Sequence, residues 1–459
     1  MPRILLLTQY FPPEIGAAQT RLFELGQELS SLGWEVEVLT ALPNYPTGRV
    51  FQGYDLRKPV REVIGRLSVV RVPLRPAQKG FVDRLRCYFS FINSVLRWGP
   101  TLCTKPDVLF VESPPLFLGH AGVRLSGRWG IPMVFNVSDL WPESAKFMGI
   151  VRNGLVLATA EALELSYYRR AALVTGTSNE IIESVRRRCP LTPAEVITNG
   201  VDITRFGSQF ADDQARSLLG NQARLTFIYA GVMGVAQGLS LVLDVAAAVR
   251  DLNHVQFVLI GDGADRELLQ RRIKAEGLHN VCLLNAQPKE KIPALLASST
   301  VGFHVLKFSI PGAVPSKIYE AMASGLPILF AGGGEGARRV LEARAGLVVP
   351  YDDVQRLAEA VRRLASDPAL RRELGSAGRH AAEQLYSRRE IAKHLHQLLL
   401  GVIGRFGYLG QDDPSYSGGG SRDSDSKVSS SLALPTPPEG GSREERGNQA
   451  HETKSWGQG

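Results

Sequence analysis

The chain has 459 residues, more than the ~100–200 of an ordinary single domain, and hydrophobic residues make up 44% of it, so we expect two domains with sizeable cores. Its formal net charge is +8, and because residues 411–459 hold eight acidic and five basic side chains, the remaining body carries +11. A basic body suits phosphorylated substrates or anionic lipid. Nucleic acid is disfavoured, because no nucleic-acid motif occurs and the basic residues are not interleaved with stacking aromatics.

The first half of the chain alternates between expected strands and helices. A strand at 4–7 precedes a loop rich in proline, and leucines then recur at helical spacing until Gly33. Further strands are expected at 36–39, 108–111, 133–135 and 172–174.

The same alternation restarts near residue 200, after a segment at 197–202 that marks the expected hinge. Strands are predicted at 226–229, 256–260 and 281–284, with helices between them, one of which runs through Val249. Alternation on this scale predicts an α/β protein with parallel, doubly wound sheets.

The end of the chain has a different composition. Residues 417–459 are rich in Gly, Ser, Pro and mixed charge, so they are predicted to be disordered. The sequence Asp423-Ser424-Asp425 in this tail matches a metal-binding DxD pattern, but so short a match in such a segment arises readily by chance.

Cysteine usage and hydropathy bear on the compartment. Four cysteines without CxxC spacing argue against a zinc site or a disulfide scaffold and fit a reducing compartment; they are Cys87, Cys103, Cys189 and Cys282. No signal-peptide pattern and no uncharged apolar stretch of ~18 residues occurs. We therefore expect a cytoplasmic chain without a membrane span.

Several stretches resemble the glycosyltransferases of family four, which have the GT-B fold. The motifs lie at 9–18, 138–144, 198–202, 261–263 and 315–327. With 43–48 added, the set most resembles bacterial O-antigen and capsule enzymes of the N-acetylfucosamine transferase type. The resemblance covers roughly residues 1–392 and excludes the tail.

This resemblance implies two Rossmann-like doubly wound domains that face a cleft. Residues 1–196 would bind the acceptor and residues 197–378 the nucleotide-sugar donor. A helical segment at 379–408 would cross back to the first domain, and residues 409–459 would form the disordered tail.

The donor side centres on a predicted helix that begins near residue 316. Ser316 follows Pro315 and is placed to cap a helix running through Met322, whose first amides would face a diphosphate. Glu320 lies one turn on, and the resemblance implies that its carboxylate accepts hydrogen bonds from the ribose hydroxyls. The alternative is a solvated glutamate paired with Lys317, which is common on helix surfaces.

Two glycines are further donor-side candidates. Gly16 and Gly234 lie in the loops that follow the first strand of each domain, where backbone amides can approach an oxyanion. An ordinary strand–helix turn also favours glycine, so this alternative stays open for Gly16.

The chain departs from the family pattern at three donor-side positions. Gly312 stands where the family has an acid that contacts the donor sugar, and Val232 and Gln237 stand where it has an arginine and a lysine on the diphosphate. The phosphate charge must then be met by amides, by Lys317 or by Lys307. A weakened or altered transferase is compatible with these departures.

The acceptor side has three carboxylate candidates. Asp139 follows a predicted strand and could orient the acceptor hydroxyl or act as a base, although an aspartate there also caps turns. Glu143 and Glu14 are weaker candidates. His304 and His120 lack partners at ligand spacing, so no metal is expected.

A helix is also predicted from Phe81 to Trp98. Its apolar residues form one stripe, at 81, 85, 88, 89, 92, 95 and 96, and Arg86 and Arg97 lie on the opposite face. Such a helix suits the headgroup boundary of an anionic membrane. The alternative is that the stripe packs on the sheet of the first domain.

Together these features predict a retaining, metal-independent glycosyltransferase. It would move a hexosyl-type sugar from a nucleotide-diphospho-sugar, UDP-linked by preference, to a saccharide or lipid-linked acceptor in surface polysaccharide biosynthesis. Two alternatives remain: a GT-B epimerase or phosphorylase, and a nucleotide-sugar-binding protein with weakened catalysis. A nicotinamide dehydrogenase is disfavoured because residues 261–266 lack the third glycine of GxGxxG.

Overall fold

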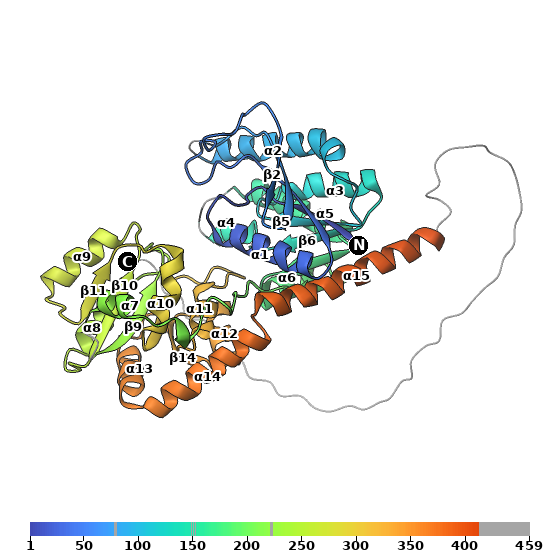
Figure 1. The fold of residues 1–459 in the computed structure, drawn as a ribbon. Helices are drawn as coiled ribbons and strands as arrows, with labels where there is room; N and C mark the ends of the chain where they lie inside the picture. Colours follow the sequence, from blue (N-terminus) through green and yellow to red (C-terminus); the bar gives the residue numbers. More distant parts are fainter. Residues whose placement is uncertain (78–79, 148, 150, 152, 221–223, 413–459) are drawn as a thin grey trace, which may run out of the picture. The chain divides into compact units, whose positions relative to one another are not determined.

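Two sheets organise the chain (Figure 1). The computed structural model describes residues 1–77, 80–147, 149, 151, 153–220 and 224–412, of which 1–412 belong to one compact unit. Of the tail predicted to be disordered from residue 409, residues 409–412 belong to the last helix, and 413–459 lie outside the described residues.

Within those residues, the first sheet has eight strands in the order β3-β4-β2-β1-β5-β6-β7-β8. The β3–β4 pair is antiparallel and the others are parallel. The strands are β1 (Arg3–Leu7), β2 (Glu35–Ala41), β3 (Val60–Ile64), β4 (Leu67–Val72), β5 (Val108–Ser113), β6 (Met133–Val137), β7 (Leu173–Gly176) and β8 (Ala194–Val196). The accompanying helices are α1 (Ala17–Ser31), α2 (Phe81–Leu102), α3 (Leu118–Trp129), α4 (Glu143–Phe147), α5 (Gly154–Arg170) and α6 (Asn179–Arg188).

The second sheet of the described residues has six parallel strands in the order β11-β10-β9-β12-β13-β14. Its strands are β9 (Leu225–Ala230), β10 (Val255–Ile260), β11 (Val281–Leu284), β12 (Val301–Val305), β13 (Ile328–Ala331) and β14 (Gly346–Val349). Its helices are α7 (Asp213–Leu219), α8 (Ser240–Ala248), α9 (Arg266–Ala275), α10 (Ile292–Ala297), α11 (Lys317–Ala323), α12 (Gly334–Glu342), α13 (Val354–Ser366) and α14 (Pro368–Gln384), with short 3-10 turns at Ser208–Phe210 and Lys289–Lys291.

Both sheets carry a hydrophobic core on each face. In β1, Leu5 and Leu7 pack on the side of α2, α3, α5 and α6, whereas Ile4 and Leu6 pack on the side of α1. The second sheet buries one face under α8, α9 and α13 and the other under α7, α10, α11, α12 and α14. Burial on both faces explains why these strands are continuous apolar runs, as is usual for parallel sheets.

The last helix, α15 (Arg388–Asp412), lies beside α1 (Figure 1). Leu395 and Leu399 of this helix join Ile4, Leu6 and Leu22 in one buried cluster. The connection before α15 also pairs with the expected hinge, because the Val201 N–H donates to the Tyr386 carbonyl (2.7 Å) and the Arg388 N–H to the Val201 carbonyl (2.9 Å).

Gly200 is required in this hinge. Its φ is +57°, and a Cβ there would lie 2.6 Å from the Tyr386 carbonyl oxygen and 2.3 Å from Ile391 Cδ1. A side chain would therefore force the two connections apart.

The predicted α/β class, the two doubly wound sheets and the strands expected in each half are confirmed. The helix predicted to run through Val249 ends one residue earlier. The domain boundaries at 196/197 and 378/379 stay predictions, and the second of them falls inside α14.

Candidate functional site

A pocket of about 290 Å³ lies at the carboxyl ends of β9 and β12 in the second half. Two loops build it, 231–238 after β9 and 306–316 after β12, together with the start of α11. Ser316 and Lys317, predicted for the donor side, line this pocket, as do Val232 and Gln237. The carboxyl edge of a parallel sheet is where such folds bind ligands.

Glycines allow the loop after β9 to lie directly against the loop after β10. Gly261 has φ +154°, and a Cβ there would lie 1.8 Å from the Gly231 carbonyl oxygen. Gly263 has φ +150° and would place a Cβ 2.4 Å from the Met233 carbonyl oxygen. The glycine pair thus holds the loop after β9 in place. Gly234 belongs to this loop and its carbonyl accepts the Gln237 N–H at 3.0 Å, but it is not among the residues that line the pocket. Its donor-side role stays a prediction.

Lys317 supplies a positive charge to this pocket. Its side chain crosses Gly231, where an added Cβ would lie 2.3 Å from Lys317 Cε. Close packing over a glycine therefore sets the direction of the lysine. Val232 and Gln237 also line the pocket, but neither side chain carries a positive charge. The Val232 side chain is mostly exposed.

His304, for which the sequence predicted no metal role, lines the same pocket. Burial, and to a lesser degree the charge of Lys317, lowers the pKa of His304 to about 3, so its imidazole is neutral. Its Nε2 is buried and has no hydrogen-bond partner among the described residues. This nitrogen lies over Gly302, where an added Cβ would be 3.1 Å from it, and it is closed to solvent. The only feature of the sequence that could have placed His304 at this pocket is its position in β12, the strand beside β9 and its loop with Gly231.

The predicted side-chain cap by Ser316 is wrong. Ser316 precedes α11, but its backbone is already helical (φ −59°, ψ −22°) and its hydroxyl makes no capping hydrogen bond. A cap requires an extended residue whose side chain can reach back to the first amides, and this backbone does not allow it.

Glu320 is half-buried in α11 but is not among the described residues that line the pocket. Burial raises the pKa of its carboxyl, and the nearby charges of Lys317, Lys289 and Arg205 oppose that rise. The carboxylate therefore lies among cations and beside the pocket-lining turn. Its contact with a ribose stays a prediction.

Gly16 is not required by its backbone. Its φ is 178°, which any residue adopts, and an added Cβ would meet only the side chain of Gln19. Its carbonyl accepts the Thr20 N–H in the first turn of α1. These observations favour the ordinary-turn alternative, and the donor-side role of Gly16 stays a prediction.

A second pocket, of about 420 Å³, lies in the first half. Three tyrosine side chains from separate segments line it together with Asn44 and Arg84: Tyr10, Tyr45 and Tyr88. The rings of Tyr10 and Tyr45 are 5.6 Å apart. Sequence reasoning missed this cluster, because its members lie in three segments with no common motif.

Glu14 is buried beneath this pocket and hydrogen-bonds the loops that line it. Only 2% of Glu14 is exposed, and its carboxylate accepts the N–H groups of Phe11 (3.1 Å), Asn44 (2.8 Å) and Tyr45 (2.8 Å). Burial raises the pKa of Glu14 and these hydrogen bonds oppose the rise. The carboxylate that was a candidate for direct acceptor contact thus holds the 43–48 loop against the 9–16 loop.

Asp139 follows β6 and is half-buried. Its Oδ1 is buried without a hydrogen-bond partner among the described residues. Burial raises the pKa of its carboxyl, and the Ser144 hydroxyl beside the carboxyl opposes the rise. An unsatisfied carboxylate oxygen is costly in isolation, so it suits a group that a ligand hydroxyl completes.

A buried network fixes the strand ends beside Asp139. Glu112 accepts hydrogen bonds from Arg21 (2.5 Å) and Asn136 (2.8 Å), and the Ser138 hydroxyl also donates to it. Thr175 donates to Asn136 at 2.7 Å. The network joins α1, β5, β6 and β7, so the backbone that carries Asp139 is rigidly placed.

Glu143 is held by an ion pair. Arg188 of α6 bridges Glu143 (2.9 Å) and the buried Glu164 (2.8 Å). Burial raises the pKa of Glu164 to about 7, although Arg188 opposes the rise. Glu143 therefore contributes to the packing of α4, α5 and α6, and its acceptor-side role stays a prediction.

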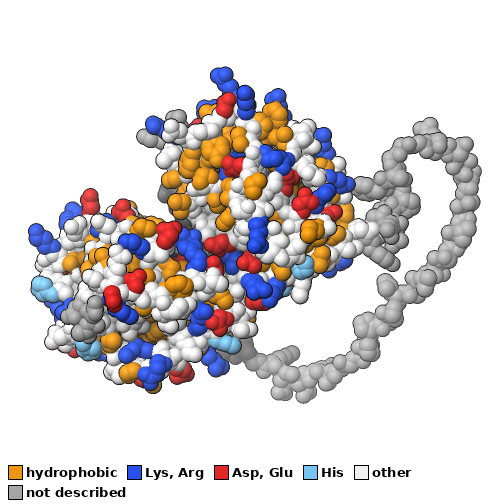
Figure 2. Space-filling model, in the orientation of Figure 1, with side chains coloured by type: hydrophobic (Ala, Val, Ile, Leu, Met, Phe, Trp, Pro, Cys, Tyr) orange, Lys and Arg blue, Asp and Glu red, His pale blue; other side chains and the backbone are white. Residues whose placement is uncertain are grey.

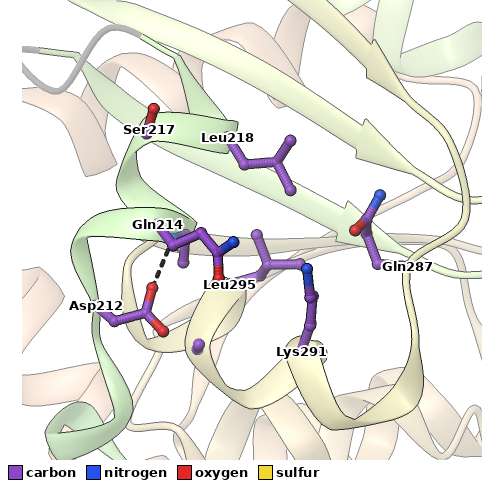
Figure 3. Close-up of a pocket in the computed structure, with 9 residues that line it drawn as sticks. Asp212, Gln214, Ser217, Leu218, Gln287, Lys291 and Leu295 are labelled. Atoms are coloured by element: carbon purple, nitrogen blue, oxygen red, sulfur yellow. Dashed lines mark hydrogen bonds between the residues drawn. The ribbon is translucent and has the colours of Figure 1, made fainter.

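A further pocket, of about 510 Å³, lies between α7 and α10 (Figure 3). The side chains of Gln214, Gln287 and Lys291 converge on it, and Asp212 at its edge caps α7 by accepting the Ala215 N–H at 2.6 Å. Most of its polar lining is exposed. None of the predicted site residues lies in it.

Among the described residues, no group of three or more His, Cys, Asp or Glu side chains is placed to hold a metal ion. Within the same residues, no helix is both long and apolar enough to cross a bilayer.

The two doubly wound sheets define the GT-B fold. Sucrose-phosphate synthase from Thermosynechococcus elongatus superposes with a TM-score of 0.69 at 20% identity, over 88% of this chain and all of that one. HepE from Anabaena in complex with UDP superposes with a TM-score of 0.65 at 18% identity, over 87% of this chain and all of that one.

The family follows from two sequence matches. Residues 16–200 match the glycosyl transferase 4-like domain and residues 211–381 match glycosyl transferases group 1. The chain is therefore built from the two domains of a glycosyltransferase. It is 28% identical over 342 residues to the putative colanic acid biosynthesis glycosyl transferase WcaI of Escherichia coli K12, over 70% of this chain and 81% of that protein. The resemblance to the N-acetylfucosamine transferase type is not tested by these matches.

Proposed function

We propose that the protein transfers a sugar from a nucleotide-diphospho-sugar, with the donor bound in the pocket lined by Lys317 and His304. The observation that carries this proposal is the Lys317 side chain in a pocket at the carboxyl edge of the second sheet. Lys317 suits the diphosphate. The bound UDP in HepE supports a uridine nucleotide as the first donor to test.

The acceptor would occupy the tyrosine pocket of the first half. Aromatic rings offer flat apolar faces to the C–H groups of a sugar, and Asn44 and Arg84 offer hydrogen bonds at the rim. The relation to WcaI supports a saccharide or lipid-linked acceptor in surface polysaccharide biosynthesis.

Catalysis in this proposal rests on positioning and charge stabilisation. The bond from the anomeric carbon to the diphosphate oxygen breaks, and the acceptor oxygen forms the new bond on the same face, which retains the configuration. The proton of the acceptor hydroxyl passes to the departing diphosphate oxygen. Lys317 stabilises the negative charge of the departing diphosphate. Asp139 accepts a hydrogen bond from the acceptor hydroxyl and orients it.

A nucleotide-sugar-binding protein with weakened catalysis is the second candidate. The observation that favours it is the absence of a cation at Val232 and Gln237, both of which line the described pocket. An epimerase or phosphorylase of the same fold is a further alternative, and release of free nucleotide without any acceptor would favour an epimerase.

A panel of UDP- and GDP-sugars tests these candidates, with and without oligosaccharide or lipid-linked acceptors. We expect one donor to be consumed only when an acceptor is present. Donor binding without turnover on any acceptor would favour the weakened binding protein.

The Asp139→Asn variant tests the acceptor-side residue. We expect its transfer rate to fall ~100-fold or more while donor affinity is unchanged, because the amide preserves shape and removes the charge. Asp213→Asn is the matched comparison, because the Asp213 side chain is 93% exposed on α7, and it should retain most activity. Equal losses in both variants would contradict the assignment of Asp139.

A further inference from the structure

Gly312, where the chain departs from the family pattern, lies against the first turn of α6. The Gly312 N–H donates to the Glu180 carboxylate at 2.8 Å, across 132 residues of sequence. Its φ is +77°, and an added Cβ would lie 2.5 Å from Ile181 Cγ1. Position 312 therefore excludes any side chain, which gives a physical reason for the glycine.

The segment that contains Gly312 is also a wall of the donor pocket. Phe308, Ile310, Ala313 and Val314 line that pocket on both sides of Gly312 in the sequence. Whatever holds Gly312 in place therefore shapes the pocket. Glu180, which belongs to the glycosyl transferase 4-like domain, is the side chain that does so.

A second contact secures the same turn of α6. The Asn179 N–H donates to Glu335 at 3.1 Å, and Glu335 is buried at the start of α12, where Arg339 pairs with it at 2.9 Å. Because α12 begins beside the 309–315 segment, where Gly336 would place a Cβ 3.0 Å from Pro315, the turn of α6 is fixed on two sides.

We propose that Glu180 is a positioning residue for the donor: by holding the Gly312 amide it sets the 308–314 wall of the pocket from the other half of the chain. This inference rests on the proposed function, since it takes the pocket as the donor site. It also links the pocket to Asp139, because α6 follows β7 and the Thr177 hydroxyl donates to the Ser138 carbonyl at 3.3 Å.

Three variants test the proposal. Glu180→Ala removes the acceptor of the Gly312 N–H, whereas Glu180→Gln keeps a carbonyl oxygen at the same reach. Glu183→Ala is the control on the same helix, because Glu183 is exposed and its contact with Arg338 is long at 3.4 Å. Amide hydrogen exchange of the 308–316 peptide in the ligand-free protein measures the wall, and titration with UDP and GDP measures the pocket.

We expect Glu180→Ala to speed exchange in the 308–316 peptide and to weaken nucleotide binding about tenfold, as loss of one hydrogen bond to a charged group would. Glu180→Gln and Glu183→Ala should stay within about twofold of wild type in both measurements. Unchanged exchange in Glu180→Ala, or unchanged affinity while wild type binds nucleotide, would overturn the inference alone. Wild type that binds neither UDP nor GDP would overturn the proposed function, and the inference with it.

Discussion

Two buried charged side chains, Arg71 and Glu14, form hydrogen bonds to the backbone of loops. Arg71 is fully buried, and its guanidinium donates to Glu62 and to the Ala41 and Pro12 carbonyls. Glu14 accepts three backbone amides close by. Both side chains form the hydrogen bonds that water would otherwise form with the loop backbone. The burial of these two charges therefore needs no ligand as an explanation.

Glu320 differs, because cations surround it and no described hydrogen bond to its carboxylate competes with a ligand. We expect Glu320→Ala to weaken nucleotide affinity by ~1.5–3 kcal/mol, the range for hydrogen bonds to a charged group. Isothermal titration with UDP measures it, and Glu342→Ala on the exposed side of α12 is the control. An unchanged dissociation constant in Glu320→Ala would remove the ribose contact.

At the scale of elements, α2 shows how packing divides an amphipathic stripe. Ile92 and Val95 of the predicted stripe, with Phe91 beside it, are buried in the core of the first sheet, whereas 50% of Phe89 is exposed. Arg86 and Arg97 are exposed as predicted. The stripe is thus mainly core, and hydrophobic side chains still gather on the surface of the half that contains α2 (Figure 2).

Peripheral membrane contact through α2 therefore remains a proposal that depends on its exposed residues. We expect wild type to sediment with anionic vesicles at low salt and to be released at high salt, because each basic residue near an anionic surface contributes ~1 kcal/mol. Arg86→Glu with Arg97→Glu should abolish sedimentation. Arg271→Glu with Arg372→Glu makes the same charge change in the second half and should not. Equal sedimentation of both double variants, or none of wild type, would contradict the proposal.

The α5–α6 pair contains a carboxyl that should make stability depend on pH. Because the pKa of Glu164 is raised to about 7 in the fold, its contribution to stability is complete below its ordinary pKa and is lost as pH rises through 7. Relative to Glu164→Gln, wild type should lose roughly 2–4 kcal/mol of unfolding free energy between pH 4.5 and 8. Urea unfolding at several pH values measures the difference.

Glu195→Gln is the control for this titration, because Glu195 forms only a long surface ion pair of 3.7 Å with Arg186. Its stability relative to wild type should not change over the same pH range. If the difference in unfolding free energy between wild type and Glu164→Gln does not change with pH, Glu164 keeps its ordinary pKa in the fold.

Each half of the molecule has a pocket, and the proposed reaction places the donor in the pocket of the second half and the acceptor in that of the first. The cation that the donor pocket offers is a lysine, and its described surroundings contain no cluster of metal ligands. From the resemblance to family four we predict that transfer continues in excess EDTA and that the product has the anomeric configuration of the donor. Activity lost in EDTA and restored by Mn²⁺ would contradict the first prediction, and an inverted product seen by NMR would contradict the second.

The sequence by itself determined the alternation of strands and helices and the α/β class with two parallel sheets. These features depend on local information: apolar runs of strand length and helical spacing. The glycosyltransferase fold came from the resemblance of its motifs to family four. That resemblance also predicted a donor side with Ser316, Lys317, Val232 and Gln237, and the structure brings these four residues to one pocket.

Only the tertiary structure decided which side chains complete each pocket. Tyr10, Tyr45 and Tyr88 meet because three separate segments pack together, and Glu180 reaches Gly312 because α6 lies against a loop 132 residues away. Burial also redirected Glu14 to backbone amides and left His304 neutral. Contacts between distant segments and the desolvation of a side chain depend on how the elements pack, and no local pattern in the sequence records either one.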